Sequence, residues 1–252
     1  MANQEWVYGI HSVRSVLERS PLRVKYILVQ QDNPNERYDS ILALAKLNDI
    51  SIQFQSLRKF DQMLPDANHQ GVLAACKPVP TLDEADIEII LQKTKEPPFL
   101  LILDGVQDPH NLGACLRTAD AVGVHAVIAP KDRSVGLTPT VLKVACGAAE
   151  SVPFITVTNL ARTMQKLKDL GVWLYGASEE ATESVFSTDL TGGVGLVMGA
   201  EGEGLRRLTR ENCDFLIKIP MNGIVESLNV SVASAVCMFE VVRQRGQHGR
   251  KS

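Results

Sequence analysis

Apolar positions in the first 75 residues alternate between strand-like runs and helix-like stripes. Apolar residues three or four positions apart predict helices, and short runs rich in β-branched residues predict strands. The predicted elements are helices at residues 12–18 and 38–47 and strands at residues 24–29, 51–54 and 71–75. This alternation predicts a small α/β unit over residues 1–75.

The pattern changes over residues 76–98, where prolines interrupt it. A Lys-Pro-Val-Pro run at 77–80 and the Pro97-Pro98 pair bracket an acidic segment, 83–92, that is predicted to form a short helix. Prolines restrict their neighbours to extended conformations, so the sequence predicts a semi-rigid linker and a domain boundary here.

Beyond residue 98 the alternation of strands and helices is more regular. The predicted strands are 99–103, 125–129, 153–157, 172–175, 194–198 and 215–219, and predicted helices include 141–149 and 160–170. Thr138 is expected to cap a helix that Pro139 opens, and Asn159 to cap one that ends before Gly171. Apolar strands separated by helices predict an α/β fold with a mostly parallel sheet, which binds ligands at the carboxyl ends of its strands.

Composition agrees with a soluble globular protein, with 45% hydrophobic and 22% charged residues. No window holds the roughly 20 apolar residues of a membrane helix, and the first residues lack the features of a signal peptide. The five cysteines form no Cys-x-x-Cys pair, which argues against a disulfide framework or a zinc ribbon. We therefore expect a cytoplasmic protein.

The net charge of −3 argues against nucleic-acid binding by broad electrostatic attraction, for which a basic balance is usual. The basic residues Arg243, Arg245, Arg250 and Lys251 are the exception, because no acidic residue follows Glu240. For such a run we expect a solvated terminus in preference to a functional contact.

Three loops that follow predicted strands carry the candidate chemistry. The first, residues 104–111, leads into a helix that reaches Gly123, and Asn111 is predicted to be its N-cap. The buried stripe of this helix would consist of Leu112, Leu116 and Ala119. Arg117 falls outside the stripe, so its planar guanidinium either points at a ligand phosphate or joins a surface ion pair.

The second loop, residues 199–204, holds three glycines in six residues after an apolar strand. Glycine permits positive φ angles and a close approach of backbone to ligand. The spacing is not a dinucleotide fingerprint, and the lysine of a P-loop is missing. The carboxylates of Glu201 and Glu203 also disfavour a triphosphate without a metal ion. A ligand-binding loop and a mobile glycine turn both fit this segment.

The third loop, residues 220–229, begins where Pro220 ends a strand by removing a backbone donor. Its polar side chains are Asn222, Glu226, Ser227 and Asn229. Ser227 is predicted to cap the next helix, and no histidine or aspartate is placed locally to activate it. It is therefore a candidate for positioning a ligand rather than a hydrolase nucleophile, and an ordinary strand–helix connection is the alternative.

Taken in order, the three loops resemble the motifs of the SpoU (TrmH) family of RNA ribose 2'-O-methyltransferases, within the SPOUT superfamily. The matching residues are Asn111, Gly113 and Arg117–Ala119 in the first motif, 196–204 in the second, and 219–221 with 227–233 in the third. The similarity extends to residues 8–11, 69–71, 108–117 and 144–153. Three motifs in the family's order are far more specific than any one of them.

The resemblance implies an architecture that the hydrophobic pattern does not. Residues 99–252 would form a trefoil-knotted methyltransferase domain, an exception to the rule that chains avoid knots. Residues 1–75 would be an RNA substrate-binding domain similar to the L30e/L7Ae ribosomal proteins, joined by the linker at 76–98. The protein would be a homodimer with active sites at the subunit interface.

The resemblance also implies a reaction, the transfer of a methyl group from S-adenosylmethionine to a ribose 2'-hydroxyl. The target would be a guanosine of 23S ribosomal RNA, in the P loop of the peptidyl-transferase centre. The leaving group is neutral, so no metal is expected, and catalysis depends on alignment and proton removal. The implied cofactor positions are Met198, Gly199, Ile219, Met221 and Leu228. The implied catalytic positions are Asn111, Arg117, Glu201, Ser227 and Asn229.

Two roles are open for Arg117: it accepts the hydroxyl proton, or it fixes the adjacent phosphate. The first role is chemically awkward because arginine stays protonated, with a pKa above about 12.

Other functions of the protein are open as well. They are a ribose methyltransferase for another ribosomal or transfer RNA nucleotide, a non-catalytic RNA-binding protein that kept the fold, and a kinase or dehydrogenase. The missing nucleotide-binding spacings disfavour the last class, and the extra N-terminal domain argues against a transfer RNA enzyme.

Overall fold

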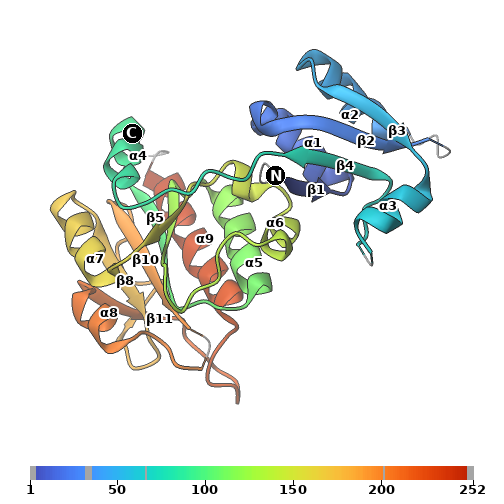
Figure 1. Cartoon of the computed structure of the whole chain (residues 1–252). Helices are drawn as coiled ribbons and strands as arrows, with labels where there is room; N and C mark the ends of the chain where they lie inside the picture. Colours follow the sequence, from blue (N-terminus) through green and yellow to red (C-terminus); the bar gives the residue numbers. More distant parts are fainter. Residues whose placement is uncertain (1–3, 32–35, 66, 201, 249–252) are drawn as a thin grey trace. The chain divides into compact units, whose positions relative to one another are not determined.

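The computed structural model describes residues 4–31, 36–65, 67–200 and 202–248 (Figure 1). Contacts between residues divide the chain into two compact units. The N-terminal unit comprises Met1–Pro80 and Leu137–Ser151, and the C-terminal unit comprises Thr81–Gly136 and Val152–Ser252. The hydrophobic pattern does not indicate that Leu137–Ser151 groups with the N-terminal unit.

The N-terminal unit contains a four-stranded sheet. Its elements are β1 (Glu5–Tyr8), α1 (Ile10–Arg19), a 3-10 turn (Pro21–Arg23), β2 (Val24–Gln30), α2 (Arg37–Leu47), β3 (Ser51–Gln55), α3 (Leu57–Met63) and β4 (Val72–Cys76). The strand order is β1-β4-β2-β3; β2 and β3 are parallel, and β4 is antiparallel to β1 and β2. Val13, Leu17 and Ile41 of α1 and α2 are buried against this sheet. All five predicted elements are present, whereas β1 and α3, with four and seven residues, are too short to establish a period.

Arg23 fastens the segment Leu137–Ser151 within this unit. Its buried guanidinium binds the carboxylates of Glu5 and Glu150 and donates to the carbonyl of Lys77 at 2.8 and 3.0 Å. Burial raises the pKa of Glu5, and the charge of Arg23 opposes that effect. Arg23 and Glu150 are 127 residues apart, so no local pattern reports their ion pair.

Within that segment, α6 (Pro139–Ala145) starts as predicted, because the Thr138 hydroxyl accepts from the Val141 N–H at 3.3 Å. The predicted helix over 141–149 is too long. Cys146 and Gly147 adopt left-handed conformations with φ of 51° and 90°, which end the helix before a 3-10 turn at Ala148–Glu150.

The C-terminal unit is built on a seven-stranded sheet. Its elements are α4 (Asp86–Lys93), β5 (Phe99–Asp104), α5 (Pro109–Val122), β6 (Ala126–Pro130), β7 (Phe154–Val157), α7 (Leu160–Asp169), β8 (Trp173–Ala177), β9 (Glu183–Ser184), β10 (Val194–Gly199), α8 (Arg207–Asn212), β11 (Phe215–Lys218) and α9 (Val230–His248). The order is β7-β6-β5-β10-β8-β11-β9, and every pairing between these described strands is parallel. The predicted α/β fold and all six predicted strands are confirmed; β9 and α8 are too short for the pattern to reveal.

Helices cover both faces of this sheet. α4 and α7 pack on one face, where Ile87, Met164 and Leu167 contact apolar side chains of the strands. α5 and α9 lie side by side on the other (Figure 1). The predicted caps of α7 are present: the Asn159 side chain accepts from the Arg162 N–H at 3.0 Å, and a left-handed glycine follows the helix.

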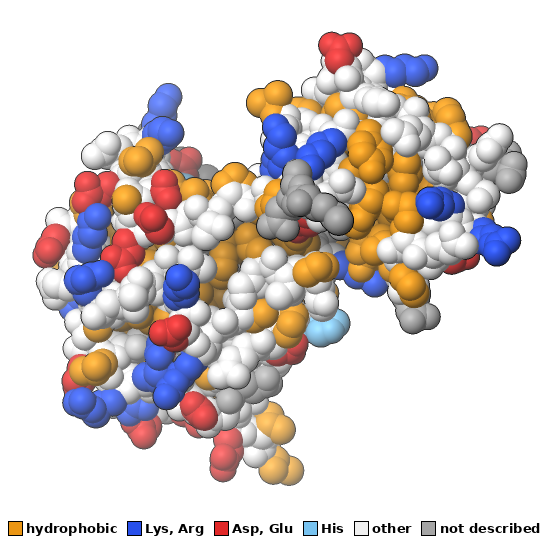
Figure 2. All heavy atoms as spheres, viewed as in Figure 1, with side chains coloured by type: hydrophobic (Ala, Val, Ile, Leu, Met, Phe, Trp, Pro, Cys, Tyr) orange, Lys and Arg blue, Asp and Glu red, His pale blue; other side chains and the backbone are white. Residues whose placement is uncertain are grey.

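Charged side chains of both signs are exposed on the C-terminal unit. On the face of the C-terminal unit seen in Figure 2, basic and acidic side chains lie next to one another and form no single basic patch. In the described part of the chain, no helix has the length and apolar content needed to span a membrane.

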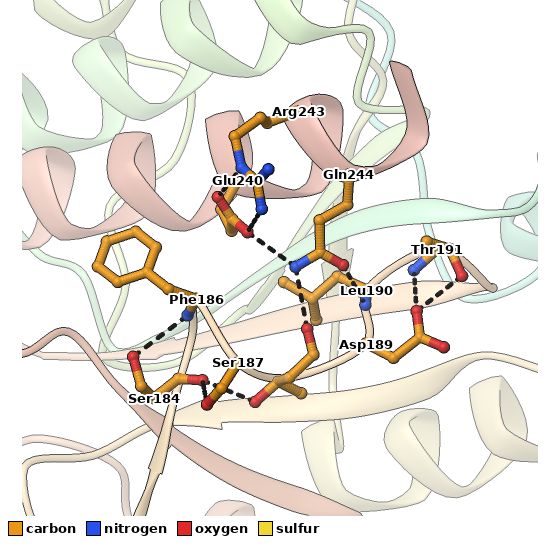
Figure 3. A network of polar contacts seen from close by, with 10 residues as sticks. Ser184, Phe186, Ser187, Asp189, Leu190, Thr191, Glu240, Arg243 and Gln244 are labelled. Carbon is orange, nitrogen blue, oxygen red and sulfur yellow. Dashed lines mark hydrogen bonds and ion pairs between the residues drawn. The ribbon is translucent and has the colours of Figure 1, made fainter. Parts of the chain in front are cut away.

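The end of α9 is held by polar contacts (Figure 3). Gln244 donates to the Thr188 carbonyl at 2.9 Å and accepts from the Leu190 N–H at 2.9 Å, and it also binds Glu240. Arg245 donates to three backbone carbonyls at 2.7–3.1 Å. A merely solvated run is therefore wrong for Arg245. Arg243 is exposed, as expected, and binds Glu240 one turn before it in the helix. Arg250 and Lys251 lie outside the described residues.

Candidate active site

The three loops singled out from the sequence follow β5, β10 and β11 at the carboxyl edge of the C-terminal sheet. β5 and β10 are neighbours, so the first two loops begin side by side. The third loop meets the first because the Asn229 side chain donates to the Asn111 side-chain oxygen at 2.9 Å. Segments separated by 118 residues thus form one site.

Asp108, not Asn111, caps α5. The Asp108 carboxylate accepts from the His110 N–H at 2.9 Å, and Pro109 occupies the first helical position, where a missing N–H costs nothing. The prediction of Asn111 as N-cap is wrong because the proline starts the helix three residues earlier than an Asn111 cap would. Asn111 instead lies inside the first turn, buried, and its side chain reaches Asn229.

The buried stripe of α5 is as predicted. Its members are Leu112, Leu116 and Ala119. Arg117 is exposed, as expected for a residue off the stripe. It lies six residues beyond Asn111, which is about 9 Å along a helix axis. Arg117 is not among the described residues that line the two cavities of this site.

Glycines shape the second loop through its own backbone. A Cβ on Gly199 would lie 2.1 Å from the carbonyl carbon of Gly204, so the loop folds back directly onto the end of β10. Ala200 and Gly204 exchange two backbone hydrogen bonds at 2.9 and 3.1 Å. Gly202 and Gly204 have the positive φ angles for which glycine is suited. Glu201 lies outside the described residues.

The buried carboxylate of Asp104 anchors the far end of this loop. It is fully buried at the end of β5 and accepts from the Arg206 N–H at 3.0 Å and from Nε at 2.6 Å. The sequence interpretation assigned no role to either residue. One feature of the sequence could have indicated this ion pair, because Asp104 is a charged residue at the end of an otherwise apolar strand.

The helix that follows the third loop begins two residues later than a Ser227 cap predicts. α9 begins at Val230, and the Asn229 side-chain oxygen accepts from the N–H of Ser231 at 3.0 Å and from its hydroxyl at 2.6 Å. The prediction of Ser227 as the N-cap is wrong because Asn229, an equally good capping residue, occupies that place. Ser227 is left in the loop, where it lines a cavity.

The larger of two adjoining cavities, here called the large cavity, has a volume of about 410 Å³. It gathers five predicted cofactor positions and one predicted catalytic position. These are Met198, Gly199, Ile219, Met221, Leu228 and Ser227. Its lining also includes residues that the motifs did not indicate. These are Ser178, Glu179, Glu180, Arg210 and Lys218.

The charged groups around the large cavity are mostly acidic. Glu179, Glu180, Glu203 and Glu226 line it together with the cations Arg210 and Lys218. Arg210 forms an ion pair with Glu180. The remaining excess of carboxylates suits a ligand that carries positive charge.

Two common types of chemistry find no support here. Burial raises the pKa of the Cys213 thiol to about 12 and that of Cys115 to about 11, so neither is a thiolate at neutral pH. Among the described residues, no group of three or more His, Cys, Asp or Glu side chains is arranged to hold a metal ion. What the site offers is a shaped cavity with polar side chains at its edge, which suits binding and alignment of reactants.

Two family models match the chain. Residues 98–239 match the model described as the SpoU rRNA Methylase family. Residues 6–82 match the model described as RNA 2'-O ribose methyltransferase substrate binding. Together the two matches cover most of the chain.

Curated relatives match over nearly their whole length. The chain is 51% identical, over 97% of its length and 98% of the relative, to the 23S rRNA (guanosine-2'-O-)-methyltransferase RlmB of Pseudomonas putida. It is 55% identical, over 96% of its length and 98% of the relative, to the protein of the same name from Vibrio cholerae.

Among solved structures, the SpoU methyltransferase AviRb from Streptomyces viridochromogenes, in complex with AdoMet, has the same fold. The TM-score is 0.80 at 23% identity, over 98% of this chain and 92% of that one.

Proposed function

The chain belongs to the SpoU rRNA methylase family, and we propose that it methylates the ribose 2'-hydroxyl of a guanosine in 23S ribosomal RNA, using S-adenosylmethionine. The observation that carries this proposal is the identity of 51–55% with relatives named for that reaction, over nearly the full length of both chains. We place the target in the P loop of the peptidyl-transferase centre, as the sequence resemblance implies.

The large cavity fits the cofactor. Its volume of about 410 Å³ lies within the usual range for small-molecule sites, about 300–1,000 Å³. The acidic excess of its lining suits a sulfonium cation. We assign cofactor binding to the predicted residues that line it. They are Met198, Gly199, Ile219, Met221 and Leu228. When bound, S-adenosylmethionine supplies an electrophilic methyl group and departs as a neutral thioether.

The residues of the chain then have to align the ribose and receive its proton. We assign the alignment to Asn111 and Asn229, which hold each other by a hydrogen bond, and to Ser227 at the cavity wall. Glu201 has the same proposed role. Arg117 would fix the phosphate beside the ribose, with the proton passing to a phosphate oxygen or to water, because a guanidinium stays protonated at neutral pH.

We further propose a homodimer with α5 and α9 at its interface. α9 exposes Val232, Phe239 and Val242, which are 49%, 55% and 38% accessible. They are seven and three residues apart, so they lie on one face of the helix. Arg117, on the neighbouring α5, would reach across this interface into the site of the partner subunit. That placement accounts for its position outside the cavities of its own chain.

Mixing two inactive variants tests this arrangement. We expect Arg117→Ala and Ser227→Ala each to reduce methyl transfer by about 100-fold or more, with cofactor affinity unchanged for Arg117→Ala. If Arg117 acts across the interface, a mixture of the two restores about a quarter of wild-type activity, since half of the dimers then hold one intact site. A mixture that stays inactive would place Arg117 in the site of its own subunit.

For the N-terminal unit we propose binding of the RNA substrate, with an L30e/L7Ae-like fold, and for the C-terminal unit a trefoil knot. We also propose that the protein is cytoplasmic. Residues 1–75 hold eight basic and eight acidic side chains, and this balance favours recognition of RNA shape over broad phosphate attraction.

The decisive experiment is transfer of labelled methyl groups to ribosomal RNA from a strain that lacks this protein. We expect one equivalent of label per 23S rRNA, on the ribose of a single guanosine, and mapping of ribose methylation gives its position. Cofactor binding without transfer to any RNA would indicate a non-catalytic protein. Transfer to transfer RNA alone would assign the other substrate class.

A further inference from the structure

A second cavity adjoins the large one within the C-terminal unit and is here called the small cavity. Its volume is about 300 Å³, and Ala200, Glu203 and Val230 line both cavities. Direct methyl transfer requires the two reactants to lie in contact. A cavity that shares a wall with the proposed cofactor site is therefore placed to hold part of the nucleotide to be methylated.

The charges of the small cavity oppose a phosphate as its occupant. Its ionisable side chains are Asp104, Asp108, Arg133, Glu203 and Arg206. Asp104 and Arg206 neutralise each other in their ion pair. One guanidinium, that of Arg133, then faces two carboxylates, which gives the lining a net charge of −1. Such a lining suits a neutral ligand that presents N–H donors to the carboxylates.

The Asp108 carboxylate is fixed in place by the start of α5. Its Oδ1 accepts from the His110 N–H at 2.9 Å, and Pro109 holds the chain in the geometry of a first helical turn. The side chain is otherwise exposed to the cavity mouth. A carboxylate held by its helix can distinguish ligands by the direction of their donors, because it does not reorient to suit each one.

Guanine presents the matching pattern. Its Watson–Crick edge carries two adjacent donors, N1–H and the 2-amino group, beside the O6 acceptor, whereas adenine presents an acceptor at N1. We propose that the small cavity holds the guanine base of the target nucleotide, with Asp108 accepting from its N–H donors and Arg133 donating to O6. This inference rests on the methyltransferase function proposed above. It requires a base that is unpaired or extruded, as is usual in sequence-specific RNA recognition.

The test combines one conservative variant with one altered base. Asp108→Asn retains the helix cap, because asparagine and aspartate cap equally well, but it replaces a carboxylate oxygen with a donor. Substrates are two 23S rRNA fragments, one with guanosine and one with inosine, which lacks the 2-amino group, at the target position. We expect the wild-type protein to favour guanosine over inosine by about 10-fold or more, and Asp108→Asn to lower transfer to guanosine by about 10- to 100-fold.

The matched control is Asp169→Asn, which removes the same charge from an exposed position on α7 that lines neither cavity. It should leave both rates unchanged. Loss of the preference for guanosine in Asp108→Asn, with unchanged affinity for S-adenosylmethionine by calorimetry, would support the proposal. Equal methylation of guanosine and inosine by the wild-type protein, or an unchanged preference in Asp108→Asn, would overturn it. Failure of the proposed function itself gives a different result, no transfer to either RNA by the wild-type protein.

Discussion

The two adjoining cavities share Ala200, Glu203 and Val230 and are otherwise lined by different segments of the chain. The large cavity takes its shape from a glycine loop folded onto β10 and from apolar side chains such as Met198, Ile219 and Leu228. The small cavity is lined mostly by charged and amide side chains at the end of β5 and in the loop that contains Arg133. The large cavity is therefore defined mainly by the shape of the backbone, and the small cavity mainly by the charges of its side chains.

This difference teaches how binding and selectivity can be separated in one site. A cavity formed by close backbone contacts tolerates no added volume, so changes there affect whether a ligand binds at all. A cavity lined by charges keeps its shape when one charge is exchanged, so changes there affect which ligand binds. Two substitutions probe this contrast, and a third probes the helix that both cavities share.

The largest expected effect comes from Asp104, whose carboxylate lines the small cavity and also anchors the loop of the large one. Asp104→Ala leaves the Arg206 guanidinium and N–H without their buried acceptor. Removing one partner of a buried ion pair costs about 3–5 kcal/mol. Because the Arg206 side chain is 38% accessible and can be hydrated, we expect the lower end of that range, about 3 kcal/mol.

Urea unfolding of the C-terminal unit, followed by tryptophan fluorescence, measures this loss. Asp169→Ala, which removes an exposed aspartate, is the control and should change the free energy of unfolding by less than about 0.5 kcal/mol. Equal stability of the two variants would show that the Asp104–Arg206 pair does not hold the loop.

Much of this fold could be predicted from the sequence, because its sheet consists of long apolar runs. The six predicted strands of the C-terminal unit lie within one or two residues of the observed ones. Helix starts were predicted well where a capping residue directly precedes a proline, so that both indicate the same first helical residue, as at Thr138 and Pro139. They were predicted poorly where two capping residues compete, as with Asp108 and Asn111, because the choice depends on a hydrogen bond rather than on periodicity.

The parts that could not be predicted depend on contacts between distant positions. Asp104 and Arg206 are 102 residues apart, and Arg23 and Glu150 are 127 apart. No local pattern registers either pair. The motifs did identify six of the residues that line the large cavity. The small cavity was missed because its charged side chains, Asp108 and Arg133 among them, follow no spacing along the chain.

A methyl group added to the wall of the large cavity tests the role of backbone shape there. Gly199→Ala places a Cβ about 2.1 Å from the backbone of Gly204, which cannot give way as a flexible side chain could. Overpacking of this kind costs about 1–3 kcal/mol, so we expect affinity for S-adenosylmethionine, measured by calorimetry, to fall by about 5- to 150-fold.

The control for this variant is Gly192→Ala, where the new Cβ would meet no atom within 4 Å. It should leave cofactor affinity unchanged. If Gly199→Ala binds the cofactor normally while Asp108→Asn does not, cofactor binding depends on the charges of the small cavity rather than on the backbone shape of the large one.

The smallest expected effect concerns the C-terminal end of α9, around Glu240. The other end of this helix begins at Val230, which lines both cavities. Hydrogen bonds from Arg243 lower the pKa of the buried Glu240 carboxyl below its ordinary value of 4.5, and burial opposes them. A carboxyl whose pKa is lower in the folded state than in the unfolded chain contributes stability at pH values above the ordinary pKa. This contribution is lost as the pH falls through the lower, folded-state pKa.

Thermal unfolding between about pH 6 and pH 3 should therefore show a smaller acid-induced loss of stability in Glu240→Gln than in the wild-type protein. Cofactor affinity at neutral pH should be the same in both, because Glu240 lines neither cavity. A change in that affinity would mean that the far end of α9 and the two cavities are coupled, and that the contrast between the cavities does not depend on their linings alone.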